Sequence, residues 1–237
     1  MTDSDGFLVM SLTVPYQDKL LPGELHLPPD EKAGICVFVH GSGSSRFSSR
    51  NRYIAEMLRK AGVGTFLMDL LTPDEEYVDM VTRHLRFDLE MLAGRVVAVI
   101  DYFTRIHEGT RSKRIALFGA STGAGAAFIA ANARPDKVHL VMARGGRADL
   151  VPPHLLHATR CPSLLMVGAN DTHVLHLNQQ AFADLGSKEK KLEVIPGASH
   201  LFEEEIFPQN EAYNTGTLEK IAELASEWAK RYLLSPE

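Results

Sequence analysis

The chain has 237 residues and a formal net charge of -5, with 45% hydrophobic and 23% charged residues. This composition is that of an ordinary globular protein and argues against extensive disorder. The length favours a single α/β domain over residues 1–237, and the acidic balance gives no electrostatic reason to expect nucleic acid as a partner.

The ends of the chain and its cysteines bear on the compartment. Residues 1–6 are polar and acidic, without the basic and then apolar order of a secretory signal. No apolar run approaches the roughly 18 residues that cross a bilayer, so we expect no membrane partner. Two cysteines do not make a disulfide framework, and a reducing, cytoplasmic location fits them. The sequence leaves open whether the protein is a monomer or a homodimer.

Short apolar runs alternate with helical patterns along the chain. Eight runs predict strands, at residues 7–14, 23–27, 34–39, 65–68, 115–118, 138–143, 163–167 and 192–195. Helices are expected at residues 51–61, 85–106, 125–130, 154–157, 175–185 and 217–233. This alternation predicts a mostly parallel sheet of about eight strands, with the first pair antiparallel and helices on both faces. Residues 70–86 show no clear period and predict a loop or short lid facing the substrate.

The chemistry of such a sheet belongs in the loops at the carboxyl ends of its strands. The pentapeptide from Gly119 to Gly123 stands between an apolar run and a helical pattern. A G-x-S-x-G pattern in that setting predicts a sharp turn that presents the Ser121 hydroxyl above the sheet, because the two glycines let the neighbouring backbone approach closely. Ordinary turns are also rich in glycine and serine, so an ordinary turn remains open on the pattern alone.

A nucleophilic serine needs a base within hydrogen-bond reach, and the base needs a partner that fixes its tautomer. His200 lies in a glycine-containing loop after the last predicted strand, and Asp171 lies in the turn after the strand before it. The order Ser121, Asp171, His200 is the one expected after an elbow serine. Asp171 could instead cap the next helix, His200 could be structural, and Asp149 and Asp69 also follow strands.

These motifs, together with the loop from His40 to Ser44, resemble the α/β-hydrolase superfamily, most closely its small dienelactone-hydrolase-like members. The resemblance covers nearly the whole chain from Gly23 onward. It implies an oxyanion hole formed by the backbone N–H groups of Ser42 and Thr122. His40 is then expected to pack the loop rather than to act as a second base.

Two departures from that family bear on the activity. Dienelactone hydrolases in the strict sense use a cysteine as the nucleophile, whereas this chain has Ser121, so the resemblance implies ester hydrolysis rather than true dienelactone activity. Residues 203–214, after the candidate histidine, are a possible insertion. The side chains of Phe207, Pro208 and Tyr213 there would wall the pocket or form a subunit contact.

Three arginines are candidates for substrate binding. Arg46 follows the oxyanion loop, and Arg144 and Arg147 follow a strand at the same end of the sheet. If they point inward, they would favour a substrate that carries a carboxylate or a phosphate. Salt bridges to Asp149 or to the acidic residues 74–76 would explain them equally well.

No cofactor or metal is expected. The loop from Gly41 lacks the third glycine of a dinucleotide fingerprint, and the chain has no phosphate-binding G-x-x-x-x-G-K-[ST] motif. The pairs His154 with His157 and His173 with His176 lack a carboxylate or cysteine that would complete a metal-binding spacing.

The sequence therefore predicts a carboxylesterase-like serine hydrolase that cleaves a small ester or lactone through an acyl-enzyme, with a Ser-His-Asp triad. Dienelactone-type hydrolysis, amide hydrolysis and acyl transfer use the same residues and remain alternatives. An alternative from another class is a ligand-binding or sensing protein that keeps the fold without turnover.

Overall fold

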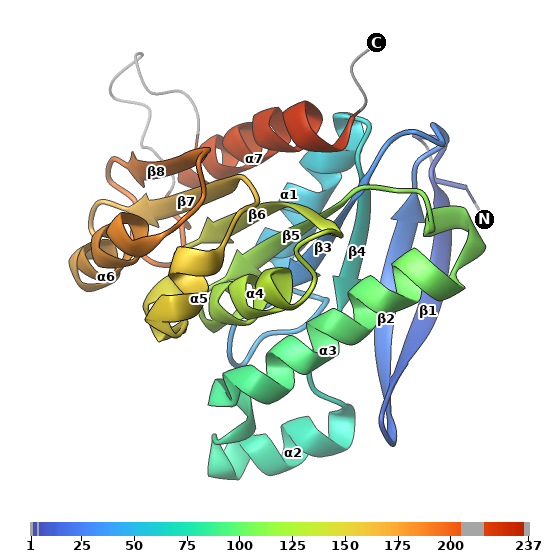
Figure 1. Cartoon of the computed structure of the whole chain (residues 1–237), viewed down its shortest axis with the longest axis horizontal. Helices are drawn as coiled ribbons and strands as arrows, with labels where there is room; N and C mark the ends of the chain where they lie inside the picture. The colour runs from blue at the N-terminus through green and yellow to red at the C-terminus, as the bar shows by residue number, and fades with distance from the viewer. Residues whose placement is uncertain (1, 4, 205–215, 235–237) are drawn as a thin grey trace.

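The computed structural model describes residues 2–3, 5–204 and 216–234 and is built around an eight-stranded sheet (Figure 1). The strand order is β1-β2-β4-β3-β5-β6-β7-β8. The strands are β1 Leu8–Tyr16, β2 Lys19–Leu27, β3 Ile35–Val39, β4 Gly64–Met68, β5 Ile115–Ala120, β6 Val138–Arg144, β7 Ser163–Gly168 and β8 Lys190–Ile195. β2 pairs antiparallel with β1 and β4, and all other pairings are parallel. The predicted α/β fold is confirmed.

Helices cover both faces of the sheet. They are α1 Ser49–Lys60, α2 Pro73–Thr82, α3 Leu89–Asp101, α4 Thr122–Ala133, α5 Pro153–Ala158, α6 Thr172–Asp184 and α7 Thr217–Leu233. Figure 1 shows α1 and α7 together on one face and α3 to α6 on the other. The apolar core is accordingly divided in two by the sheet, with Ile54 and Ile221 in one cluster and Val96 and Phe128 in the other. Strands covered on both faces explain why β3, β4, β5 and β7 are buried throughout.

The opening hairpin is tighter than the sequence predicts. The strands predicted at 7–14 and 23–27 leave residues 15–22 for the turn, but β1 and β2 continue until only Gln17 and Asp18 separate them. Pro15 and Pro22 both lie within strands, paired with Leu20 and Thr13. β1 is the edge strand of the sheet, where a proline removes no obligatory ladder hydrogen bond, so Pro15 does not end it.

The segment 70–86 is largely a helix, and the expectation of a loop is wrong there. α2 starts with a capping box, in which Thr72 and Glu75 satisfy each other's backbone amides, and Pro73 occupies the first turn. Periodicity misses this helix because apolar residues lie on its exposed side, including Tyr77, Met80 and Val81. Figure 1 shows α2 at the bottom of the view, next to the start of α3. Whether α2 acts as a lid stays a prediction.

Two ion pairs fix the ends of α2 in place. Arg95 of α3 donates to both carboxylate oxygens of Glu75, at 2.6 and 2.7 Å. Near the other end, Arg86 donates through Nε to the buried carboxylate of Asp79 at 2.5 Å. α2 is therefore attached to the elements on both sides of it.

The helix predicted over 85–106 is shorter than expected. Asp88 caps α3 by accepting a hydrogen bond from the Met91 amide at 3.0 Å, and residues Tyr102–Ile106 form a π-helical turn after it. The apolar stripe continues across these changes because Val96, Val99 and Phe103 are all buried.

Most of the proposed insertion, residues 205–214 of 203–214, lies outside the described residues, together with Phe207, Pro208 and Tyr213, so this expectation stays a prediction. In the described part of the chain, no helix has both the length and the apolar character needed to span a membrane.

Candidate active site

Ser121 forms the turn between β5 and α4 in a strained backbone conformation. Its φ and ψ angles are 50° and -125°, values that non-glycine residues rarely adopt. Its N–H donates to the carbonyl of Arg144 at 3.2 Å, and its own carbonyl accepts from the amides of Ala124 and Arg147 at 3.1 and 2.9 Å. These backbone hydrogen bonds hold the turn that G-x-S-x-G predicts.

The two glycines of the motif are needed for close packing. A Cβ atom on Gly119 would lie 2.4 Å from the Cα atom of Ala124, and one on Gly123 would lie 2.2 Å from the carbonyl oxygen of Val39. Neither position can accept a larger residue without displacement of the backbone. The two positions therefore require glycine for steric reasons.

His200 and Asp171 meet at the carboxyl edge of the sheet. The Nδ1 atom of His200 lies 2.6 Å from Oδ2 of Asp171, and their side chains are 38% and 14% exposed. Because an ionised carboxylate only accepts hydrogen bonds, this contact places the imidazole proton on Nδ1 and leaves Nε2 free to take a proton. Asp171 also starts α6, as its N-cap, but its side chain makes no capping hydrogen bond.

Ser121 and His200 line one cavity of about 200 Å³. Gly145 leaves room for the imidazole, because a Cβ atom there would be 3.3 Å from the ring. In the described part of the chain, the Ser121 hydroxyl forms no hydrogen bond with His200. Catalytic hydrogen bonds are often long in the absence of substrate, so this arrangement is compatible with a serine and its base.

The loop after β3 lies beside the candidate nucleophile. A Cβ atom on Gly41 would be 3.0 Å from that of Ser121. The Ser42 amide, expected as an oxyanion donor, donates here to the hydroxyl oxygen of Thr122 at 3.0 Å. Thr122 is the first residue of α4, and its own amide belongs to the first turn of that helix. The two residues expected to form the oxyanion hole are thus in direct contact.

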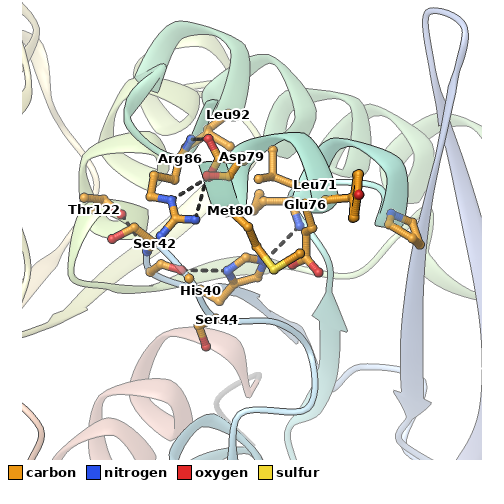
Figure 2. A pocket seen from close by; sticks show the side chains of 15 residues that line it. His40, Ser42, Ser44, Leu71, Glu76, Asp79, Met80, Arg86, Leu92 and Thr122 are labelled. Carbon is orange, nitrogen blue, oxygen red and sulfur yellow. Dashed lines mark hydrogen bonds and ion pairs between the residues drawn. The ribbon is translucent and has the colours of Figure 1, made fainter. Parts of the chain in front are cut away.

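His40 connects this loop to the backbone that follows β4. Its Nδ1 lies 2.9 Å from the carbonyl oxygen of Gly41, and its Nε2 accepts a hydrogen bond from the Leu70 amide, also at 2.9 Å (Figure 2). Burial lowers the pKa of His40, which keeps the ring neutral, as this hydrogen-bond pattern requires. Both ring nitrogens are therefore committed to the backbone, in keeping with a loop-packing residue.

A second cavity of about 380 Å³ lies between the loop and α2 (Figure 2). Leu71, Met80 and Leu92 give it an apolar lining. Arg86 also reaches it, but its charge is compensated by Asp79. Burial and the nearby charge of Asp69 raise the pKa of Glu76, which also lines this cavity.

The three candidate arginines have different surroundings. Arg46 forms an ion pair with Asp69, and Arg147 donates to both carboxylate oxygens of Asp149, at 2.8 and 2.9 Å. The pair of Arg147 with Asp149 is one that the sequence left as an alternative, whereas the sequence did not name Asp69 as a partner of Arg46. Arg144 lies in the cavity beside Ser121, is only 7% exposed and pairs with no carboxylate among the described residues.

Strand-end reasoning missed the residues that the start of α1 contributes to this cavity, among them Arg50 and Asn51. Both belong to the first turn of α1, and Asn51 Oδ1 accepts a hydrogen bond from Arg144 at 3.4 Å. A helix start carries no catalytic motif, and the only available signal was that this helix directly follows the loop after β3.

The described residues contain no cluster of three or more potential metal ligands. Cys36 and Cys161 are both free, and burial raises the pKa of the Cys161 thiol to about 11, which disfavours a reactive thiolate.

Comparison with known proteins agrees with the fold. The structure of a dienelactone hydrolase from Anabaena variabilis superimposes with a TM-score of 0.87 at 45% sequence identity, covering 96% of this chain and 99% of that one. Est1E from Butyrivibrio proteoclasticus gives a TM-score of 0.74 at 16% identity over 93% of this chain and 98% of its own, which shows the fold alone. The chain belongs to the α/β-hydrolase superfamily, among its dienelactone-hydrolase-like members, and the 45% identity to the Anabaena variabilis protein supports a hydrolase.

A curated relative carries a different name. The chain is 46% identical over 208 residues to a Mycobacterium tuberculosis protein named "putative phosphoribosyl transferase". That match covers 88% of this chain but only 43% of the relative, so the chain spans less than half of the curated protein. No family model matches the chain.

Proposed function

We propose that this protein is a carboxylic ester hydrolase that cleaves a small ester or lactone through an acyl-enzyme on Ser121. The observation that carries the proposal is the 2.6 Å contact between His200 and Asp171, in a cavity that His200 shares with the strained Ser121. A fixed imidazole beside a serine that lines the same cavity at the end of a parallel sheet is the arrangement that acyl transfer requires.

In the proposed mechanism, the Ser121 oxygen attacks the ester carbonyl carbon while Nε2 of His200 takes the hydroxyl proton. A new serine ester bond forms, the bond from the carbonyl carbon to the alcohol oxygen breaks, and His200 returns the proton to that oxygen. Water then repeats the sequence, releasing the acid and restoring Ser121. Asp171 stabilises the imidazolium in both halves of the reaction.

The oxyanion donors in this proposal are the Thr122 amide at the start of α4 and the Ser42 amide or its neighbour in the loop. The position of Thr122 at a helix N-terminus supports its role, because the helix dipole favours negative charge there. The Ser42 amide would be shared between the Thr122 hydroxyl and the oxyanion. Loss of one such donor typically costs about 2.7 to 4 kcal/mol of transition-state stabilisation.

Dienelactone-type hydrolysis is the second candidate, favoured by the 45% identity to a protein described as dienelactone hydrolase. A lactone would follow the same steps, with the alcohol remaining attached to the acyl group. The transferase name belongs to a curated protein that this chain matches over 43% of its length, and the serine-centred site supports hydrolysis instead.

An active-site-directed fluorophosphonate tests the proposal. The wild-type protein should be labelled at Ser121, and Ser121→Ala should abolish both labelling and hydrolysis of a panel of short esters and lactones. An unlabelled wild-type protein would refute an activated serine and favour a binding or sensing role. Labelling without hydrolysis, together with transfer of the acyl group to an added alcohol, would identify an acyltransferase.

A further inference from the structure

The cavity beside Ser121 has a cationic wall built from two elements. Arg144 comes from the end of β6, and Arg50 comes from the first turn of α1. Ser48, the N-cap of the same helix, lies in the cavity with them. His200 and Ser121 form another part of the lining, so this charge lies next to the reacting groups.

Arg144 is buried without a paired carboxylate among the described residues, and its guanidinium carbon lies 5.8 Å from the centroid of the Phe202 ring. Its Nε atom has no hydrogen-bond partner among the described residues, and its one side-chain hydrogen bond there is the 3.4 Å contact to the neutral Asn51. Burial, and then the positive charge of Arg50, lower the pKa of Arg144 to about 10, so it remains charged at neutral pH. A buried cation is costly unless an anion accompanies it, so the position suits a site that an anion completes.

The surroundings of Arg144 add further donors. Arg50 pairs with Glu203, whose side chain is 60% exposed, and the Nε atom of Arg50 is buried without a partner in the described part of the chain. α1 is twelve residues long and has no acidic residue in its first turn; the neutral hydroxyl of its N-cap, Ser48, accepts a hydrogen bond from the Asn51 amide at 3.4 Å, so no negative charge in that turn compensates the positive dipole end. Two guanidinium groups and a helix N-terminus thus converge on one side of Ser121.

The cavity beneath α2 has the opposite character. It shares Gly41, Ser42 and Ser44 with the cationic cavity, but neither Ser121 nor His200 lines it. Its lining is mostly apolar, and its one arginine, Arg86, is paired with Asp79. The loop after β3 therefore separates an apolar space from a cationic one, with the candidate oxyanion donor Ser42 at the boundary.

The position of His200 decides which part of an ester enters which cavity. In the mechanism proposed above, the proton on His200 must reach the oxygen of the departing alcohol, so that oxygen lies on the His200 side. The acyl part then extends past Ser42, away from His200. The alcohol is consequently the part that meets Arg144 and Arg50.

We propose that the substrate is an ester of an apolar acid with an alcohol that carries an oxyanionic group, a phosphate or a carboxylate, which Arg144 binds together with Arg50 and the first turn of α1. Arginine suits either group because its planar guanidinium donates two parallel hydrogen bonds to an oxyanion. This inference rests on the proposed ester hydrolase activity and specifies the substrate class of the same site.

Charge placement in the substrate provides the test on the wild-type protein. The butyryl esters of glycolate and of ethylene glycol monophosphate carry the anion on the alcohol, and the butyryl ester of glycolamide is their neutral counterpart. Monomethyl succinate carries the anion on the acyl side, and methyl butyrate is its neutral counterpart. We expect kcat/KM to be at least about tenfold higher for an anionic alcohol than for glycolamide, as charge-assisted hydrogen bonds imply. Monomethyl succinate should be a poorer substrate than methyl butyrate.

The two anionic alcohols separate a phosphate from a carboxylate as the preferred group. The proposal would be overturned if the glycolate, phosphate and glycolamide esters had equal kcat/KM values. It would also be overturned if the enzyme preferred monomethyl succinate to methyl butyrate. Fluorophosphonate labelling of Ser121 in the same preparation shows whether the hydrolase itself is active, so failure of the substrate inference is distinguishable from failure of the proposed function.

A variant then assigns the effect to the arginine. Arg144→Gln should reduce the ratio of kcat/KM for anionic over neutral alcohols at least about tenfold. Arg52→Gln is the control for loss of an arginine charge, because Arg52 lies on α1 close to Arg50 but makes a half-exposed pair with Glu24, outside this cavity. This variant should keep the ratio within about twofold. An unchanged ratio in a folded Arg144→Gln protein would remove Arg144 from the site. If that variant does not fold, the wild-type charge comparison decides the question.

Discussion

The hydroxyl oxygen of Thr122 accepts a hydrogen bond from the Ser42 amide at 3.0 Å, and this contact joins the loop after β3 to the first residue of α4. The residues are 80 positions apart in the chain and belong to the two halves of the proposed oxyanion hole. The spacing between the two backbone amides therefore depends on a side chain as well as on the sheet.

Thr122→Val should weaken catalysis, since valine keeps the shape of threonine but cannot accept the Ser42 hydrogen bond. One neutral hydrogen bond contributes about 1 kcal/mol, so kcat/KM for a short ester should fall about five- to tenfold. Thr122→Ser, which retains the hydroxyl, should remain near wild type. Steady-state kinetics of both variants check this, and a fully active valine variant would show that the loop is positioned without Thr122.

Gly145→Ala should impair catalysis more than it impairs folding. Gly145 has a φ of +52°, and an added Cβ would lie 3.3 Å from the His200 ring. Gly62 is a matched control, with a φ of +86° and nothing within 4 Å of an added Cβ. Both alanine variants should lose about 1–2 kcal/mol of unfolding free energy, because both need a left-handed backbone.

The two variants should differ in kcat, which we expect to fall at least about tenfold in Gly145→Ala alone, since small displacements of catalytic groups are costly. Urea unfolding and ester hydrolysis, measured on both proteins, give the comparison. Equal activity in the two variants would mean that the His200 ring adjusts to the extra carbon atom.

His40 should make stability depend on pH near neutrality. Burial lowers its pKa in the folded state, whereas the unfolded residue titrates near about 6.5. Below about pH 6.5 the unfolded state therefore binds more protons than the folded state, and the unfolding free energy decreases as the pH falls towards the folded pKa. Above this window His40 is neutral in both states and adds no pH dependence.

His40→Asn removes this titrating group, so its urea unfolding free energy should change less than that of the wild type between about pH 7.5 and pH 5. The variant should also be less stable at the higher pH by about 1–3 kcal/mol, because the buried Leu70 amide loses its acceptor. Parallel pH profiles for the two proteins would contradict the role assigned to His40.

Asp79→Asn should loosen α2. Asp79 is 1% exposed and accepts hydrogen bonds from Arg86 and from the Leu85 amide, at 2.5 and 2.8 Å. Weakening these contacts should cost about 1–3 kcal/mol and increase amide hydrogen exchange within α2. Asp74→Asn, at an exposed site of the same helix, should change exchange far less, and equal protection in both variants would contradict this account.

The loops that carry the candidate residues could be located from the sequence because clear apolar patterns mark the strands that precede them. Ser121, Asp171 and His200 each follow a strand, and the structure brings these ends to one edge of the sheet. Chain order and parallel pairing therefore place the candidate residues without any knowledge of the loops. Their catalytic roles stay predictions.

Features that depend on contacts between distant segments were not predictable. α2 was missed because its outward side is apolar, so no polar face marks it as a surface helix. The three arginines look alike in the sequence, and only tertiary structure separates the carboxylate-paired Arg46 and Arg147 from the buried Arg144. The place of Arg50 beside Ser121 depends on how α1 packs, which local sequence does not encode.

The hydrogen bonds that hold the turn at Ser121 all run through its main chain, from its amide to Arg144 and from Ala124 and Arg147 to its carbonyl. The side chain therefore plays no part in building the geometry that presents it. If Ser121 is the nucleophile, as proposed, the reactive atom can be exchanged without rebuilding the turn, and a single substitution would convert serine chemistry to cysteine chemistry on the same scaffold. A change of nucleophile in such a fold would therefore leave the turn intact. It would require a base whose proton affinity matches that of the new nucleophilic side chain.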